Sequence, residues 1–215
     1  MMYTHIIWDF NGTLIDDVEI GIKTVNTLLK RRGLKTLDSK EDYHKVFGFP
    51  IIEYYKKIGF DFDKESFNDI AVEWVDEYLS NSKSAGVYEG VVDVLTELKG
   101  NGIKQIILSA TEREMLLLQV RQLRIEKYFF DILGLDNIHA HSKVDIAVEW
   151  IKKEKPVKAL LIGDTTHDFE VSKAINTDCI LISNGHQSKS ILKKCGVQVI
   201  DNVKQIIPLL LNKKS

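Results

Sequence analysis

The stretch Ile6-Ile7-Trp8-Asp9-Phe10-Asn11-Gly12-Thr13-Leu14 decides the fold of this chain, because it puts a carboxylate directly behind a short apolar run. The apolar residues ahead of Asp9 are typical of a buried strand, and Asn-Gly indicates a turn where that strand ends. A carboxylate at the exit of a buried strand suggests a nucleophile or a metal ligand. Asn11, two residues later, is an amide where a second acid would be the natural partner for acid–base chemistry.

Short apolar runs alternate with amphipathic stretches along the rest of the chain. The runs at residues 5–9, 103–108, 157–164, 179–183 and 197–200 are bounded by Gly, Asp or Asn and predict buried strands. Between them, residues 91–98, 112–123, 143–153 and 168–175 carry apolar side chains at helical spacing. This alternation predicts an α/β fold built on a parallel sheet with helices on both faces.

Residues 19–81 interrupt that alternation, because they hold several helical patterns and no convincing strand. The clearest helices are predicted at 20–29 and 67–79, where Trp74 and Tyr78 form an i,i+4 aromatic pair that we expect in a core rather than around a ligand. The flanks, Asp16-Asp17 and residues 82–86, are polar or small, as in domain linkers. We therefore predict a core domain at 1–16 and 86–215 and an inserted helical domain at 17–85.

Composition excludes several classes of partner. The chain has 215 residues, enough for one sizeable domain and a smaller inserted one, and Lys+Arg 29 against Asp+Glu 31 gives a net charge of -2. This balance gives no electrostatic reason to expect nucleic acid or an anionic membrane as partner. Cys179 and Cys195 lack CxxC spacing, and neither a secretion signal nor a membrane-length apolar run is visible, so we expect a cytoplasmic protein.

Ligands of open α/β sheets bind beyond the carboxyl ends of the strands, and polar residues of this chain gather at those positions. They are Asp9, Asn11 and Thr13 after the first predicted strand, Ser109, Ala110 and Thr111 after the second, Lys143 at a helix start, and residues 163–168 after the strand at 157–164. Carboxylates can bind Mg²⁺ or accept a phosphoryl group, while hydroxyls and a lysine can bind phosphate. The set predicts a magnesium ion and a phosphate group at one edge of the sheet.

These motifs, taken in order, resemble those of the haloacid dehalogenase superfamily, and within it the small phosphatases with a helical cap, of the phosphoglycolate phosphatase type. The resemblance rests on the run from Asp9 to Thr13, on Ser109, on Lys143 and on residues 163–168, and it covers nearly the whole chain. It implies a Rossmann-like, doubly wound core whose inserted α-helical cap closes over the substrate. It also implies a Mg²⁺-dependent phosphatase that hydrolyses a small soluble phosphomonoester through an aspartyl-phosphate on Asp9.

Carried over residue by residue, the resemblance makes Asp9 the nucleophile and a Mg²⁺ ligand. The backbone carbonyl of Asn11 and the side chain of Asp164 become further ligands, and Asp168 supports the metal site or pairs with Lys143. The implied catalytic set is Asp9, Asn11, Ser109 and Lys143, and the implied metal set is Asp9, Asn11, Asp164 and Asp168. Contacts with the substrate are expected from Thr13, Phe47, Gly48, Ser109, Ala110 and Lys143.

The chain departs from the family pattern at Asn11, where most such phosphatases have an aspartate that protonates the leaving oxygen. An amide cannot exchange that proton, and the lost assistance is worth about 10²–10⁴-fold. Three readings stay open. The enzyme is slow on poor leaving groups or uses another acid, for which His167, Asp16 and Asp17 are positional candidates. Alternatively, the aspartyl-phosphate is hydrolysed slowly, or the site binds phosphate ligands without turnover.

Rival functions and weaker motifs can be weighed from the same residues. Cleavage of a C–P bond, as in phosphonoacetaldehyde hydrolases, needs a cap lysine in an apolar setting, and none is obvious. The candidates are Lys23, Lys30, Lys45 and Lys56. A non-catalytic phosphate-binding protein is the other alternative.

The remaining motifs are expected to be structural. We expect His139, His141 and residues 184–186 to lie in loops, and residues 30–32 to form a solvated helix end. We expect the protein to be a monomer or a homodimer.

Overall fold

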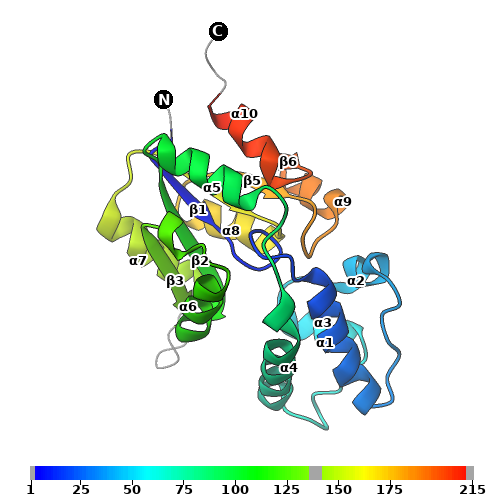
Figure 1. The fold of residues 1–215 in the computed structure, drawn as a ribbon. Coiled ribbons are helices and arrows are strands. Elements are labelled where there is room, and N and C mark those ends of the chain that lie inside the picture. The colour runs from blue at the N-terminus through cyan, green and yellow to red at the C-terminus, as the bar shows by residue number, and fades with distance from the viewer. Residues whose placement is uncertain (1–2, 136–141, 212–215) are drawn as a thin grey trace.

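The computed structural model describes residues 3–135 and 142–211, which contain a six-stranded parallel sheet of order β3-β2-β1-β4-β5-β6 (Figure 1). The strands are β1 His5–Trp8, β2 Lys104–Glu112, β3 Asp131–Leu135, β4 Ala159–Gly163, β5 Asp178–Ile182 and β6 Gln198–Ile200. The chain adds β2 and β3 on one side of β1 and then crosses to β4 on the other. The chain therefore continues from β1 toward one edge of the sheet and from β4 toward the other edge. Such sheets bind ligands between two strands of this kind.

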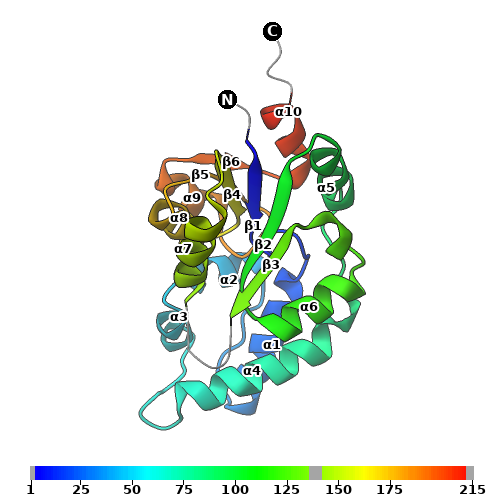
Figure 2. The ribbon, with the colours of Figure 1, turned by 90° about the vertical axis from the view of Figure 1, so that its left-hand side faces the viewer.

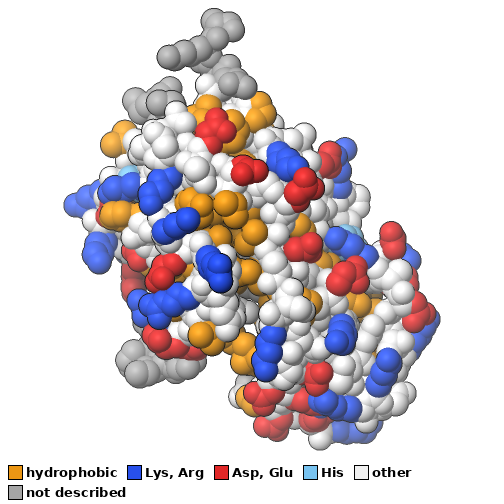
Figure 3. Space-filling view, viewed as in Figure 1, with side chains coloured by type: hydrophobic (Ala, Val, Ile, Leu, Met, Phe, Trp, Pro, Cys, Tyr) orange, Lys and Arg blue, Asp and Glu red, His pale blue; other side chains and the backbone are white. Residues whose placement is uncertain are grey.

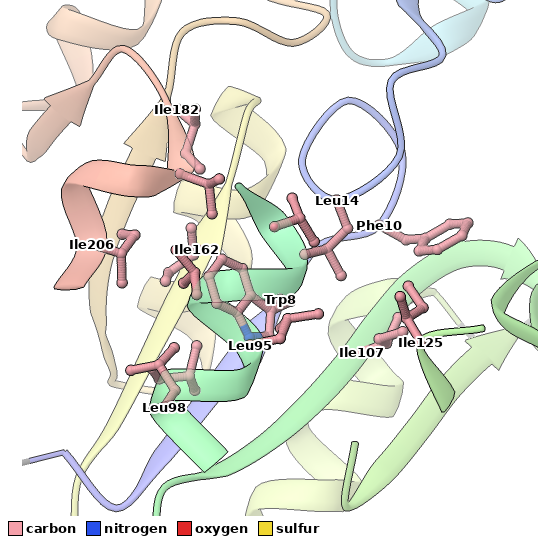
Figure 4. Close-up of a cluster of buried hydrophobic side chains, with 14 of the residues drawn as sticks. Trp8, Phe10, Leu14, Leu95, Leu98, Ile107, Ile125, Ile162, Ile182 and Ile206 are labelled. Carbon is pink, nitrogen blue, oxygen red and sulfur yellow. The ribbon is translucent and has the colours of Figure 1, made fainter. Parts of the chain in front are cut away.

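Helices cover both faces of the sheet, as the alternating pattern predicts. They are α5 Val91–Gly100, α6 Arg113–Gln122, α7 Lys143–Glu154, α8 Thr166–Ala174, α9 Lys189–Leu192 and α10 Ile206–Leu210, with short 3-10 turns at Ser82–Ser84, Glu126–Tyr128, Lys193–Cys195 and Val203–Gln205. Successive residues of β1 point to opposite faces, so Trp8 joins the cluster under α5, α6 and α10 while Ile7 joins the cluster under α7 and α8. Figure 4 shows Trp8 with Leu95 and Ile162 in the first of these clusters. The predicted doubly wound α/β fold is confirmed.

Two features of the sheet differ from the sequence prediction. The edge strand β3 was not expected, and β2 continues to Glu112 after a register shift beyond Leu108, so that residues 109–111 lie inside the strand rather than after it. The side chain of Glu112 accepts hydrogen bonds from the backbone N–H groups of Glu114 and Met115. Because this carboxylate caps the helix, α6 begins at Arg113 and not at residue 112.

The segment between β1 and α5 folds into four helices, which we call the cap: α1 Val18–Arg31, α2 Lys40–Val46, α3 Ile51–Lys57 and α4 Phe67–Asn81. They pack around their own apolar cluster beyond the carboxyl edge of the sheet (Figure 2). Lys30 and Arg31 meet solvent as expected, whereas the Arg32 side chain is only 18% exposed. Arg31 and Arg32 also tie α1 to α4 through ion pairs with Glu73 of 2.7 and 2.5 Å. The domain boundaries at 17 and 85 stay a prediction.

The surface and the helix lengths bear on possible partners. On the face seen in Figure 3, positive and negative side chains are interspersed. Within residues 3–135 and 142–211, no helix combines the length and the apolarity that crossing a membrane requires. The cytoplasmic location and the monomeric or dimeric state stay predictions.

Candidate active site

The ends of β1 and β4 bring two of the predicted motifs into direct contact. Asp9 follows β1 and Asp164 follows β4, and these strands are hydrogen-bonded neighbours. The hydroxyl of Thr13 donates to Asp9 Oδ2 at 3.1 Å and to Asp164 Oδ1 at 2.9 Å. A single turn after β1 therefore fixes both carboxylates relative to each other, although they are far apart in sequence.

Lys143 connects this pair to a third carboxylate. Its ammonium group is buried and contacts Asp9 Oδ1, and it donates to Asp168 Oδ1 at 2.6 Å. The other oxygen of Asp168 accepts from the backbone N–H and the hydroxyl of Thr165, which forms the capping box of α8. Burial opposes the charge on Lys143, but the two carboxylates raise its pKa above the ordinary value. Lys143 therefore stays an ammonium ion.

The three carboxylates form a buried cluster whose chemistry suits a divalent cation. One oxygen from each of Asp9, Asp164 and Asp168 lies within 4.8 Å of the others. Burial raises the pKa of Asp9 despite Lys143, and it raises the pKa of Asp164 to about 6. For Asp168, by contrast, burial is outweighed by Lys143 and Thr165, which hold its pKa below the ordinary value. The buried negative charge that lacks compensation therefore lies on Asp9 and Asp164. Carboxylate oxygens are the ligands that Mg²⁺ prefers, so the donor set fits that ion.

Two glycines let the backbone approach Asp164 closely. Gly12 has φ +71°, and a Cβ placed on it would lie 2.4 Å from Asp164 Oδ2. A Cβ on Gly185 would lie 2.1 Å from the same oxygen. A Cβ on Gly12 would also lie 2.5 Å from His186 Cδ2. Real side-chain carbons do not approach so near, so a larger residue at Gly12 crowds both Asp164 and His186, and one at Gly185 crowds Asp164.

We expect Gly12→Ala to lower the free energy of unfolding clearly more than Gly33→Ala. Both glycines have positive φ, but a Cβ on Gly33 meets nothing within 4 Å. The shared backbone conformation costs an L-residue about 1–2 kcal/mol, and crowding of Asp164 and His186 adds about 1–3 kcal/mol in Gly12→Ala only. Urea denaturation of both variants measures the difference. Equal losses would show that Asp164 and His186 move aside without cost.

The carboxamide of Asn11 is held at both ends. Its nitrogen donates to Asp17 Oδ2 at 2.7 Å and to the Tyr78 hydroxyl at 3.0 Å. Its oxygen accepts from the Thr111 hydroxyl at 3.0 Å. The amide is therefore a fixed structural link between the sheet edge and α4, and it carries no proton that it can transfer.

Asp17 and His186 form a buried pair that the sequence analysis did not anticipate. The Asp17 side chain is 2% exposed and the His186 side chain 12% exposed, with Oδ1 and Nε2 3.4 Å apart. His186 Nδ1 lies 2.8 Å from the Tyr43 hydroxyl of the cap, and its backbone N–H donates to Asp164 Oδ2 at 2.6 Å. Burial disfavours a charged ring, but Asp17 raises the pKa of His186 to about 9. His186 lies in the loop after β5, as expected, and the place of that loop next to the end of β4 is a signal that could have identified its contact with Asp164.

A cavity of about 290 Å³ lies between the sheet edge and the cap. Its floor is formed by Asp9, Asn11, Ser109, Ala110, Lys143 and Asp164, and its walls include Tyr43, Phe47, Phe49, Tyr54, Tyr55, Trp74 and Tyr78. The Ser109 hydroxyl donates to the Thr111 hydroxyl at 3.0 Å. Trp74 and Tyr78 stack with centroids 4.8 Å apart, and both line the cavity in addition to packing in the cap.

The structure places most, but not all, of the predicted site residues on this cavity. Gly48 does not line it and faces Gln187, while Thr13 and Asp168 act from behind the lining residues. Of the candidate acids, Asp17 and His167 line the cavity and Asp16 does not. Burial and the charge of Lys143 lower the pKa of His167. His139 and His141 lie outside the described residues.

Comparisons with known proteins identify relatives of this chain. A family model described as haloacid dehalogenase-like hydrolase matches residues 6–182. The phosphoglycolate phosphatase of Pseudomonas fluorescens (strain Pf0-1) is 24% identical over 212 residues, covering 94% of this chain and 78% of that protein. A Caldanaerobacter subterraneus protein provisionally named pyrophosphatase PpaX is 25% identical over 202 residues, covering 90% of this chain and 88% of that protein.

Solved structures share the fold over nearly the whole chain. A haloacid dehalogenase-like family protein of Streptococcus pneumoniae has a TM-score of 0.82 at 20% identity, covering 96% of this chain and 98% of that chain. Protein Tyrosine Kinase A of Mycobacterium tuberculosis has a TM-score of 0.82 at 19% identity, covering 98% and 99%. At such identities the likeness establishes the fold alone, and these two names refer to different reactions. Because the family model matches most of its length, the chain belongs to the haloacid dehalogenase-like hydrolase family.

Proposed function

We propose that this protein is a Mg²⁺-dependent phosphatase that hydrolyses a small phosphomonoester through an aspartyl-phosphate on Asp9. The observation that carries the proposal is the convergence of Asp9, Lys143 and Asp164 at the floor of one cavity. Family membership, together with relatives that are named phosphoglycolate phosphatase, supports hydrolysis of phosphoric monoesters. The proposal goes beyond this family membership in naming Mg²⁺ and a covalent aspartyl-phosphate.

The reaction follows from what each side chain can do. An Asp9 oxygen attacks phosphorus, the ester P–O bond breaks, and its electron pair leaves with the departing oxygen. Water then attacks the phosphorus of the aspartyl-phosphate, which releases phosphate and restores the carboxylate. Thr13 and Lys143 hold the Asp9 carboxylate in one orientation, and the Lys143 charge lies beside it. Fixed orientation and a nearby positive charge both lower the barrier to phosphoryl transfer.

The three carboxylates of the cluster have different roles. Asp9, Asp164 and, from the family resemblance, the backbone carbonyl of Asn11 would hold Mg²⁺, which neutralises charge on the phosphate when bound. Asp168 uses one oxygen for Lys143 and the other for Thr165. It is therefore better suited to position Lys143 than to bind the ion itself.

Removal of divalent cations is expected to stop the reaction. Phosphate release from 4-nitrophenyl phosphate should fall by at least about 10²-fold when a chelator is added, because a metal ion supplies several kcal/mol of transition-state stabilisation. Added Mg²⁺ should restore the rate, and Asp164→Asn should need a higher Mg²⁺ concentration for half-maximal activity. Unchanged rates in the chelator would remove the metal from the proposal.

Cleavage of a C–P bond is less well supported by the cavity. Among the lining residues that the structure describes, Lys143 is the sole lysine, and it is bound to two carboxylates. Lys45 and Lys56 of the cap form exposed ion pairs with Asp42 and Glu53 instead. An amine free to form a Schiff base with an aldehyde is therefore not presented to the cavity by the described residues. Borohydride trapping with an aldehyde substrate would reveal one.

A further inference from the structure

The cap presents an aromatic wall to the phosphate-binding floor. It consists of Tyr43, Phe47, Phe49, Tyr54, Tyr55, Trp74 and Tyr78, supplemented by Ile51 of α3 and Met115 of α6. Flat rings favour the burial of another flat apolar group, with an additional gain of about 0.5–1.5 kcal/mol for each well-placed aromatic pair. A volume of about 290 Å³ leaves space for a small ligand only. The wall therefore selects for a compact, ring-containing leaving group.

The same wall offers little to a second negative charge. Among the described residues that line the cavity there is no arginine, and the one lysine, Lys143, is bound to Asp9 and Asp168. Both ring nitrogens of His186 are engaged, with Asp17 and with Tyr43. The His167 ring stacks on Phe49, with centroids 4.8 Å apart. The Tyr54 hydroxyl on the cavity wall has no hydrogen-bond partner and could donate to an anion, but no described lining side chain offers an unpaired positive charge. Burial of a carboxylate or a second phosphate would therefore lack a compensating charge, which is costly.

The hydrogen bonds around Asn11 limit the kind of oxygen that can leave. Asn11 cannot donate a transferable proton, and its donors and acceptor are all engaged. Asp17 accepts hydrogen bonds from Asn11, Gly12 and Tyr78, as an ionised carboxylate does. An alkoxide departs slowly without a proton, whereas a phenolate departs readily because its charge is delocalised into the ring.

We propose that, given the phosphatase activity proposed above, the substrate is an aryl phosphate monoester without a second anionic group, bound with its ring against the aromatic wall. The Asp9 oxygen–phosphorus bond forms as the aryl oxygen–phosphorus bond breaks, and the electron pair leaves on the phenolate, which takes its proton from solvent. Water then attacks the phosphorus, the Asp9 oxygen–phosphorus bond breaks with its electron pair returning to the carboxylate, and a phosphate oxygen takes a proton from the attacking water. The aromatic wall and the absence of a proton donor at Asn11 thus both favour aryl phosphates.

The experiment compares kcat/KM for phenyl phosphate, 2-naphthyl phosphate, benzyl phosphate and phosphoglycolate in the presence of Mg²⁺. Benzyl phosphate is the decisive control, because it carries the same ring as phenyl phosphate but leaves as an alkoxide. We expect kcat/KM for both aryl esters to exceed that for phosphoglycolate by at least about 10²-fold. The value for benzyl phosphate should lie between those of the aryl esters and that of phosphoglycolate. Phosphoglycolate turnover equal to or above that of the aryl esters would overturn the substrate class alone. Absence of phosphate release from every ester would overturn the phosphatase proposal as well.

Variants of the wall separate ring binding from leaving-group reactivity. Trp74→Ala should raise KM for 2-naphthyl phosphate by about 3–10-fold and leave KM for phosphoglycolate unchanged, since the lost contact is aromatic. If Trp74→Ala folds poorly, Phe49→Ala tests the same wall, because Phe49 is 39% exposed. Phe62→Ala is the matched control, because Phe62 packs in the cap without lining the cavity. Equal effects of the wall variants on both substrates would overturn recognition of the ring.

Discussion

Asp9→Asn should abolish phosphate release, with kcat falling by about 10⁴–10⁶-fold, the loss found when a covalent nucleophile is removed. An amide of the same shape cannot attack phosphorus, and it leaves Lys143 with Asp168 as its remaining carboxylate contact. Phosphate release from 4-nitrophenyl phosphate with Mg²⁺ measures the effect. Acid quenching during turnover of a phosphorus-labelled substrate should leave label on the native chain and none on the variant.

The control for Asp9→Asn is Asp93→Asn, the same change at an exposed position of α5. It should leave both the rate and the labelling unchanged. Circular dichroism and urea denaturation show whether either variant has lost its fold. If Asp9→Asn keeps measurable turnover while folded, the nucleophile is another group and the aspartyl-phosphate mechanism is wrong.

The close approach of Asp9 and Asp164 is the part of the site that sequence predicts best. Each follows a short buried run, and the carboxyl ends of parallel strands share one edge of the sheet, so local pattern is enough to bring them to the same side. The structure makes these strands neighbours and adds the Thr13 hydroxyl between the two carboxylates. The parallel strands bring the two carboxylates to the same edge of the sheet, and the turn at Gly12 lets the backbone approach Asp164 closely.

The pairing of Asp17 with His186 could not be predicted in the same way. It depends on contacts between segments far apart in sequence, with Tyr43 of α2 bound to the imidazole from the cap side. The edge strand β3 was missed because it is short, contains Gly134 and begins with an acidic residue. Trp74 and Tyr78 pack in the cap as predicted, and only their second role as lining of the cavity could not be predicted. A helix face that packs in a core and one that lines a cavity bury apolar residues at the same spacing, as Trp74 and Tyr78 show.

Asn11→Asp should raise the turnover of alkyl phosphates by about 10²-fold or more, and that of aryl phosphates much less, because only an alkoxide needs a proton to leave. The surroundings favour the acidic form of the introduced group. The Asn11 nitrogen lies 2.7 Å from Asp17 Oδ2, so a carboxyl in its place would press against an existing carboxylate. Two carboxyl groups that close cannot both ionise readily, and one of them keeps a proton. That proton is then available to the departing oxygen.

The measurement is kcat/KM for benzyl and phenyl phosphate over a range of pH, with Asn68→Asp as the control at an exposed position of α4. In Asn11→Asp the benzyl phosphate rate should fall as pH rises through the pKa of the new pair, since the protonated form is the active acid. The phenyl phosphate rate should lack this descending limb. Equal or lower rates on both esters would mean that the amide is not a missing acid but a part of the Asp17 and Tyr78 network that the enzyme needs intact. The aryl preference would then have to come from the aromatic wall alone.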